Sequence, residues 1–171
     1  MKLIGWSLII ISVISLMIII VVDVVAERDY NSRFGSYWEL ADRSSTLQAK
    51  EQYITQFVSN IQTNRDDFAD YNAIIIKTPQ NNFDNNLGAV ITLRDRLQEV
   101  QKMNVSSFEY QLAIQQITGQ EQGEADAMMN DIEGAFYLRN YPLLWNWICG
   151  ILIFLILITL TIGITMLMLS K

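Results

Sequence analysis

The amino-acid sequence predicts an all-α protein in which two transmembrane helices flank a three- or four-helix antiparallel bundle outside the membrane. Two long apolar runs without charge lie near the ends of the 171-residue chain. Between them, apolar residues recur at helical spacing, and the only prolines in the sequence are Pro79 and Pro142, so long helices are permitted. These observations divide the chain into residues 1–26, 27–140 and 141–171.

The first apolar run predicts an N-terminal membrane anchor. The 20 residues from Leu3 to Val22 contain no charge, which matches the roughly 20 residues that a helix needs to cross a hydrocarbon core. Lys2 and the small residues at 24–26 are also typical of a signal peptide and its cleavage site. Because the apolar run is longer than the ~7–15-residue core of a signal peptide, we expect residues 1–26 to remain as an uncleaved anchor.

The second apolar run predicts a C-terminal transmembrane helix. The 27 residues from Leu143 to Leu169 contain no charge, so this helix can cross the membrane with some tilt. Aromatic residues with a polar tip gather where a membrane meets water, because they combine an apolar ring with a hydrogen-bonding group. The residues expected to anchor the two spans in this way are Trp6, Tyr141, Trp145 and Trp147.

The charges next to the spans give two opposed signals for orientation. Lys2, the α-amino group and Lys171 lie on the short tails, which favours cytoplasmic tails and an extracytoplasmic segment 27–140. Arginines flank the spans on the other side, at positions 28, 33, 43 and 139. The segment that carries them exceeds the ~60 residues over which loop charges are counted, so we expect the first orientation.

Two helices are expected in the first half of the bundle. Ile54, Phe57 and Ile61 continue a buried stripe that starts at Leu47 within residues 44–62. Ser45 and Gln48 have the spacing of a capping box at its start, although a helix continuing straight from the first span is an alternative. A second cap at Thr63 with Asp66 predicts another helix, which buries Phe68, Tyr71 and Ile75 and ends before Pro79.

The clearest turn predicted by the sequence is residues 77–86, KTPQNNFDNN. It combines a proline, four asparagines and an aspartate, which favour turns. We expect it to be the membrane-distal tip of the bundle.

Two seams follow this turn. Val90, Leu93, Leu97 and Val100 form just under two heptads of a coiled-coil-like seam. Ser106 and Glu109 then form a capping box that opens a long helix reaching to Asn140. Its seam begins at Phe108 and ends with Ala125, Met129, Ile132 and Phe136, while glutamines and a threonine occupy the positions between.

Small residues mark four candidate positions for packing against a partner. Gly119 and Gly123 present a flat face within the long helix, where another backbone can approach; a kink between two helices is the alternative. Thr159 and Gly163 form a small-xxx-small pair in the second span. Gly5, Ser12 and Ser15 would let the first span pack closely on the second or on a neighbour.

The composition excludes several kinds of chemistry. The chain has no histidine, one cysteine (Cys149) and a net charge of −6, which argues against histidine-based catalysis, zinc sites and nucleic-acid binding. Asp66, Asp67 and Asp70 are grouped as in a cation site, but placement in the first turns of a helix explains them better. We therefore expect no catalytic residues, cofactor or metal. Asn104 begins a glycosylation sequon, usable only on a translocated segment.

Two functions are compatible with this sequence. The first is a non-catalytic structural or accessory subunit, whose spans and helical segment pack against other integral membrane subunits or against copies of itself. The second is a two-span sensor that binds a small molecule and signals through a partner. The absence of site chemistry favours the first.

Overall fold

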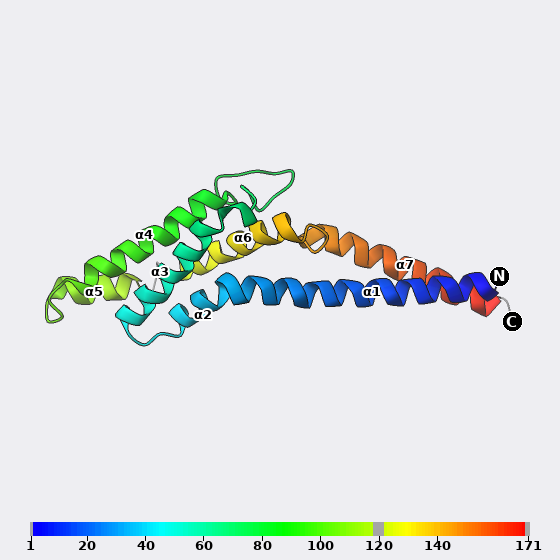
Figure 1. Ribbon diagram of the computed structural model, residues 1–171, viewed down its shortest axis with the longest axis horizontal. Coiled ribbons are helices and arrows are strands. Elements are labelled where there is room, and N and C mark those ends of the chain that lie inside the picture. Colours follow the sequence, from blue (N-terminus) through cyan, green and yellow to red (C-terminus); the bar gives the residue numbers. More distant parts are fainter. Residues whose placement is uncertain (1, 118–121, 170–171) are drawn as a thin grey trace. The chain divides into compact units, whose positions relative to one another are not determined.

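The computed structural model describes residues 2–117 and 122–169. Most of these residues are helical; they contain an isolated bridge between Tyr71 and Asn82 but no strand (Figure 1). The prediction of an all-α protein is confirmed. The chain divides into two compact units: an apolar unit of residues 1–28 and 141–171, and a helical unit of residues 29–140. The elements are α1 (Lys2–Tyr30), a π-helix (Asn31–Gly35), α2 (Ser36–Asp42), α3 (Leu47–Thr63), a 3₁₀ turn (Arg65–Asp67), α4 (Phe83–Gln101), α5 (Phe108–Gln116), α6 (Gln122–Asn140) and α7 (Asn146–Leu169).

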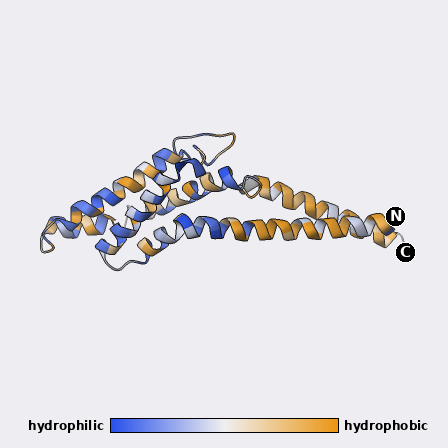
Figure 2. Ribbon diagram, in the orientation of Figure 1, coloured by the Kyte–Doolittle hydropathy of each residue, from blue (hydrophilic) through white to orange (hydrophobic). Residues whose placement is uncertain are grey.

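The apolar unit contains two helices that are long and apolar enough to cross a membrane, as expected. Only 6% of the most apolar window of each helix is buried, so most of the apolar side chains there are exposed. Figure 2 shows that hydrophobic residues dominate both helices. The two helices meet at glycines. A Cβ atom added to Gly163 would lie 3.0 Å from the carbonyl oxygen of Gly5, and one added to Gly5 would lie 3.1 Å from that of Gly163.

A hydrogen bond joins the same two helices further along. The Ser12 and Thr159 hydroxyl oxygens are 2.8 Å apart, and Ser12 is buried. In an apolar surrounding a hydroxyl gains from a partner in this way. The contacts place Gly163 and Thr159 against Gly5 and Ser12 of the same chain.

The first helix continues well beyond the apolar run, but it does not reach α3. A continuous helical stretch runs from Lys2 to Asp42, with the π-helix inside it. The chain then breaks before Thr46, whose hydroxyl accepts a hydrogen bond from the Ala49 amide at 3.2 Å and caps α3. Both sequence interpretations of this junction were therefore wrong: Ser45 is not the cap, and no helix passes through it.

The helix predicted between Thr63 and Pro79 is absent. After α3 and the 3₁₀ turn, residues 68–82 form a loop whose backbone pairs with distant partners. The Ala69 amide donates to the Ala135 carbonyl at 3.0 Å, and the Phe83 amide donates to the Asp70 carbonyl at 2.9 Å. These tertiary bonds replace the helical ones. Phe68 is buried as predicted, whereas Ile75 is 75% exposed.

The turn predicted at residues 77–86 is displaced toward the N-terminus. Asn82 caps α4 by accepting a hydrogen bond from the Asn85 amide at 2.9 Å, so residues 83–86 are helical. The asparagines expected to make a turn instead cap a helix and donate side-chain hydrogen bonds to backbone carbonyls of the loop. The predicted cap of the next helix is also shifted by one residue, because Ser107 rather than Ser106 accepts from the Tyr110 amide at 3.1 Å.

The core of the helical unit follows the α3, α4 and α6 seams. α4 packs on both α3 and α6. The side chains of Ile54, Phe57 and Ile61 in α3 are buried, as predicted. The predicted seam residues of α4 and α6 are also buried: Val90, Leu93, Leu97, Val100, Ala125, Met129, Ile132 and Phe136. Phe108 is the exception, since it is 73% exposed.

The single long helix predicted from 106 to 140 is described as two parts. α5 ends at Gln116 and α6 begins at Gln122. Gly119 lies outside the described residues, and the surroundings of Gly123 in α6 are likewise outside the description. The alternatives of a kink or a partner contact at these glycines therefore stay predictions.

Gly134 of α6 leaves room for the side chain of Asn72, which belongs to the loop at residues 68–82. The Asn72 side chain lies so close to Gly134 that an added Cβ would clash with it, while Gly88 of α4 has open space around it. We expect Gly134→Ala to lower the free energy of unfolding of the helical unit by about 1–3 kcal/mol through overpacking. Gly88→Ala is expected to raise it by about 1 kcal/mol, because alanine favours helix. Urea unfolding of both variants measures the difference, and equal effects would contradict this role of Asn72.

Candidate functional site

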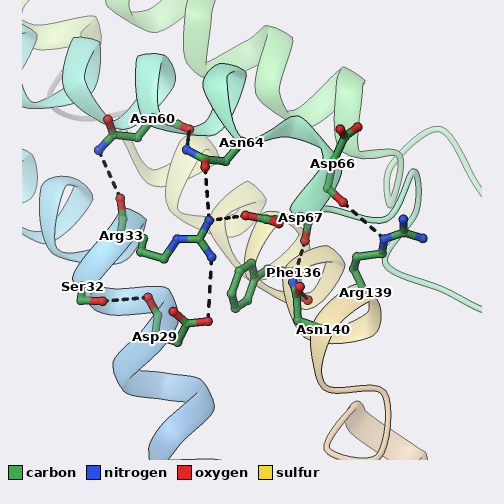
Figure 3. A network of polar contacts seen from close by, with 10 residues as sticks. All are labelled: Asp29, Ser32, Arg33, Asn60, Asn64, Asp66, Asp67, Phe136, Arg139 and Asn140. Atoms are coloured by element: carbon green, nitrogen blue, oxygen red, sulfur yellow. Dashed lines mark hydrogen bonds and ion pairs between the residues drawn. The ribbon is translucent and has the colours of Figure 1, made fainter.

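A polar network gathers at the end of the helical unit where the chain enters and leaves it (Figure 3). We call it the Arg33 cluster. Its members come from the end of α1, the π-helix, the end of α3, the 3₁₀ turn and the end of α6: Asp29, Arg33, Asn64, Asp66, Asp67, Arg139 and Asn140.

Arg33 is the centre of the cluster. Its guanidinium group pairs with the Asp67 carboxylate, donates to the Asn64 side-chain oxygen at 3.3 Å and lies 3.9 Å from the Asp29 carboxylate. It also sits over the Phe34 ring, 4.9 Å from the centroid, and 5.9 Å from that of Phe136. The planar guanidinium suits this combination, because it can donate in several directions while its face rests on an aromatic ring.

The 3₁₀ turn connects this arginine to the last helix. The Asn140 amide group donates to the Asp67 carbonyl at 2.7 Å, and the Arg139 Nε donates to the Asp66 carbonyl at 3.3 Å. Asp67 thus accepts from Arg33 with its carboxylate and from Asn140 with its carbonyl. One short turn therefore contacts both the first and the last residues of the helical unit.

The π-helix determines where Arg33 points. A π-helix widens the turn by one residue and shifts the side chains that follow it. A Cβ on Gly35 would clash with the Asn31 side chain and press on the Tyr30 ring, so a larger residue here would have to displace them. The Arg33 carbonyl accepts from the Asn60 amide group at 3.2 Å, which fixes the π-helix to α3.

An aromatic cluster lies next to these polar groups. Phe34 and Phe136 are fully buried, with ring centroids 5.8 Å apart, and Phe68 contacts both at 5.0 and 5.6 Å. Tyr30 packs on Phe136 at 5.5 Å. Rings packed at tilted or edge angles stabilise a fold by more than their buried area alone provides. The Arg33 cluster therefore lies against a well-packed aromatic core.

The acidic group predicted at Asp66, Asp67 and Asp70 does not open an α-helix: the first two residues lie in the 3₁₀ turn Arg65–Asp67 and the third in the loop that follows. Asp67 pairs with Arg33, and Asp70 pairs with Arg65 at 2.9 Å. Within residues 2–117 and 122–169, His, Cys, Asp and Glu side chains do not gather in threes as a metal ion would need. For Asp67 and Asp70, ion pairing replaces the interpretation as partners of a helix dipole.

Two further surfaces stand out. A cavity of about 140 Å³ lies beside the π-helix, lined by Tyr30, Asn31, Gly35, Trp38, Glu39, Met129 and Glu133. The second surface, which we call the apolar face of α5, is formed by Val105 in the turn before this helix and by Phe108 and Leu112 of the helix itself, which are 67%, 73% and 44% exposed. α5 itself has no fully buried residue.

The expected interface anchors are placed as follows. Trp6 is 57% exposed and Trp145 is 6% exposed. Tyr141 is half-buried, and the side chain of Trp147 lies outside the description. The Asn104 side chain accepts from the Ser106 amide at 3.0 Å, within the exposed turn between α4 and α5.

The chain matches no family model, no curated protein and no solved structure.

Arg33 is expected to stabilise the helical unit far more than an ordinary surface arginine. Arg33→Ala removes an ion pair, a hydrogen bond and the stacking on Phe34, so we expect the free energy of unfolding to fall by about 2 kcal/mol. Arg33→Lys should recover less than half of this, since an ammonium group cannot reproduce the planar contacts. Arg43→Ala is the control: Arg43 is 76% exposed and pairs with Glu39 within one helix, which predicts a change of about 0.3 kcal/mol. Urea unfolding measures both changes. Equal losses of unfolding free energy in Arg33→Ala and Arg43→Ala would contradict this role of Arg33.

Proposed function

We propose that this chain is a non-catalytic, two-span integral membrane protein that acts as a structural or accessory subunit of a larger membrane complex. Residues 27–140 form a helical bundle on the extracytoplasmic side, and both termini are cytoplasmic. The observation that carries this proposal is the exposed apolar face of α5. We expect a partner protein to bind there.

The exposure of this face is a consequence of how α5 sits on its neighbours. Tyr110, Ala113 and Ile114 are half-buried, and the following Ile117 is fully buried. Phe108 and Leu112 are four residues apart and therefore lie on one face. An apolar helix face left in water costs free energy, and such patches mark protein–protein contacts.

The chemistry of α5 indicates the kind of partner. Its sequence, FEYQLAIQQ, has Glu109 as its only charged residue, and amide side chains flank the apolar ones. A matching surface is apolar and uncharged, which is typical of subunits that stay assembled rather than of encounters steered by charge. The partner that fits is another integral membrane subunit; a second copy of this chain is the other outcome of the test.

Photo-crosslinking in the native membrane tests the proposal. A photoreactive amino acid replaces Leu112 in the full chain, and Ser59, which is exposed on α3, carries it in the control. We expect one adduct of constant mass from position 112 and none from position 59. Phe108→Asp in the same chain should remove that adduct without changing helicity. Equal adducts from both positions, or none from position 112, would overturn the proposal.

The cavity beside the π-helix favours the second candidate, a sensor of a small molecule. π-helices are frequent at functional sites, and Glu39 and Glu133 give this cavity an acidic lining. Its volume of about 140 Å³ is below the ~300–1,000 Å³ of ordinary ligand pockets, so only a small cationic or polar ligand fits. A thermal-shift screen with small amines tests it: stabilisation that Glu133→Gln abolishes would favour the sensor.

A further inference from the structure

We infer that the loop between residues 72 and 81 inserts its isoleucines into the surface of the membrane that the two spans cross. We call it the isoleucine loop. This inference rests on the membrane part of the proposed function and is independent of the partner at α5.

The isoleucine loop presents an apolar surface that is unusual for a loop in water. Ile74, Ile75 and Ile76 are consecutive and are 46%, 75% and 74% exposed. Lys77 follows them and is also exposed, with its ammonium group 5.0 Å from the centroid of the Tyr71 ring. Apolar side chains next to a cation and an aromatic ring are the pattern of segments that lie in a lipid interface.

The loop holds its isoleucines in place through backbone hydrogen bonds. The Asn72 amide donates to the Asn81 carbonyl at 2.9 Å and closes the loop. The Asn81 amide group donates to the Ile76 carbonyl at 2.9 Å, and the Asn86 amide group donates to that of Gln80 at 2.9 Å. Because side-chain amides satisfy this backbone, the isoleucines are displayed by an ordered loop.

The loop lies at the end of the helical unit where the chain enters and leaves. Asn72 donates to the Asp131 carboxylate at 3.0 Å and the Ala69 amide donates to the Ala135 carbonyl, while Asp67 and Asp66 contact Asn140 and Arg139. Figure 1 shows the loop extending past the first residues of α4, toward the end of the unit where α6 finishes. This corrects the expectation of a bundle tip far from the chain connections.

The helical unit is joined to both apolar runs by short segments of chain. Asn140 is followed by Tyr141 and, a few residues later, by the uncharged run that begins at Leu143. Asp29 is only seven residues beyond Val22, about 10 Å along a helix. The loop therefore belongs to the end of the helical unit that is joined through short segments to both apolar runs. Exposed isoleucines at this end would gain free energy by leaving water for the lipid interface.

Quenching of a fluorophore by spin-labelled lipid tests the inference. Cys149 is replaced by alanine, and Ile75→Cys in the full chain is labelled with an environment-sensitive fluorophore. The protein is reconstituted in phosphatidylcholine–phosphatidylglycerol vesicles that contain spin-labelled lipid, with the nitroxide near the headgroup in one sample and along the acyl chain in a second. Ile10→Cys within the first apolar run and Lys102→Cys in the turn after α4 are matched controls, since both positions are exposed.

We expect quenching at positions 75 and 10, by about half at position 75 as for a side chain in the interface, and none at position 102. Quenching at position 10 without position 75 would overturn this inference and leave the proposed function intact. No quenching at position 10 would overturn both, because the spans would not be in the bilayer. Quenching at all three positions would also overturn it, since the whole helical unit would then lie on the membrane.

Discussion

Leu97→Asp is expected to abolish cooperative unfolding of the helical unit. Leu97 is fully buried in α4, which packs between α3 and α6. A carboxylate in this position must either stay charged in an apolar core or take up a proton, and both cost several kcal/mol. A loss of about 4–5 kcal/mol is comparable to the whole stability of a domain of this size.

Amide hydrogen exchange of the full chain in mild detergent measures this effect. The α4 amides should be protected in the wild type and should exchange rapidly in Leu97→Asp, while the amides of α7 stay protected in both. Thr92→Asp places the same charge on an exposed position of α4 and should leave protection unchanged. Protected α4 amides in Leu97→Asp would show that this seam does not form the core.

Gly163→Leu is expected to separate the two helices of the apolar unit. An added Cβ would already lie 2.9 Å from an Ile9 side-chain carbon and 3.0 Å from the Gly5 carbonyl oxygen. The remaining atoms of leucine have no room there, so the helices must move apart at a cost of about 2–3 kcal/mol. Gly150→Leu is the matched control in α7, because Gly150 has open space around it.

Disulfide formation between the helices reports on their separation. Ser12→Cys and Thr159→Cys are introduced together in a Cys149→Ala background, where their hydroxyl groups are hydrogen-bonded in the wild type. Oxidation in membranes should link them within one chain, and Gly163→Leu should slow the reaction at least about tenfold, which corresponds to about 1.4 kcal/mol. An equal rate in Gly163→Leu and Gly150→Leu would show that the glycine contact does not hold the hairpin together.

Periodicity predicted the parts of this fold that bury a continuous stripe. The seam residues of α3, α4 and the end of α6 recur at three- and four-residue spacing, and they are buried. The two apolar runs were recognisable because their length and lack of charge do not depend on tertiary contacts. The caps of α3 and α5 were predicted to within one residue, since neighbouring serines and threonines at 45–46 and 106–107 compete for the same role. The predicted cap at Thr63 was wrong, because no helix follows it.

The loop at residues 68–82 was beyond the reach of periodicity. Phe68, Tyr71 and Ile75 have helical spacing, but the backbone there bonds to α6 and to Asn81 instead. Gly134, more than sixty residues away, makes the room for Asn72 that this arrangement needs. Tertiary contacts thus overrode local spacing, and nothing within the segment indicated it.

The Arg33 cluster was also missed, for a related reason. Arg33 was considered only as a charge beside a span, while its partners Asn64 and Asp67 lie 31 and 34 residues further along. A signal did exist: Arg33 and Gly35 lie 11 and 13 residues beyond Val22, the end of the apolar run, and Asp67 follows the end of the helix predicted over residues 44–62. Recognising it requires the π-helix, which no simple pattern predicts.

Native mass spectrometry of the full chain, extracted from its own membrane in mild detergent, tests most directly whether this protein is a structural subunit. We predict an assembly of constant stoichiometry with larger subunits, which Phe108→Asp dissociates and Ser59→Asp leaves intact. A chain that is monomeric at every detergent concentration, or an assembly that Phe108→Asp leaves unchanged, would contradict the account.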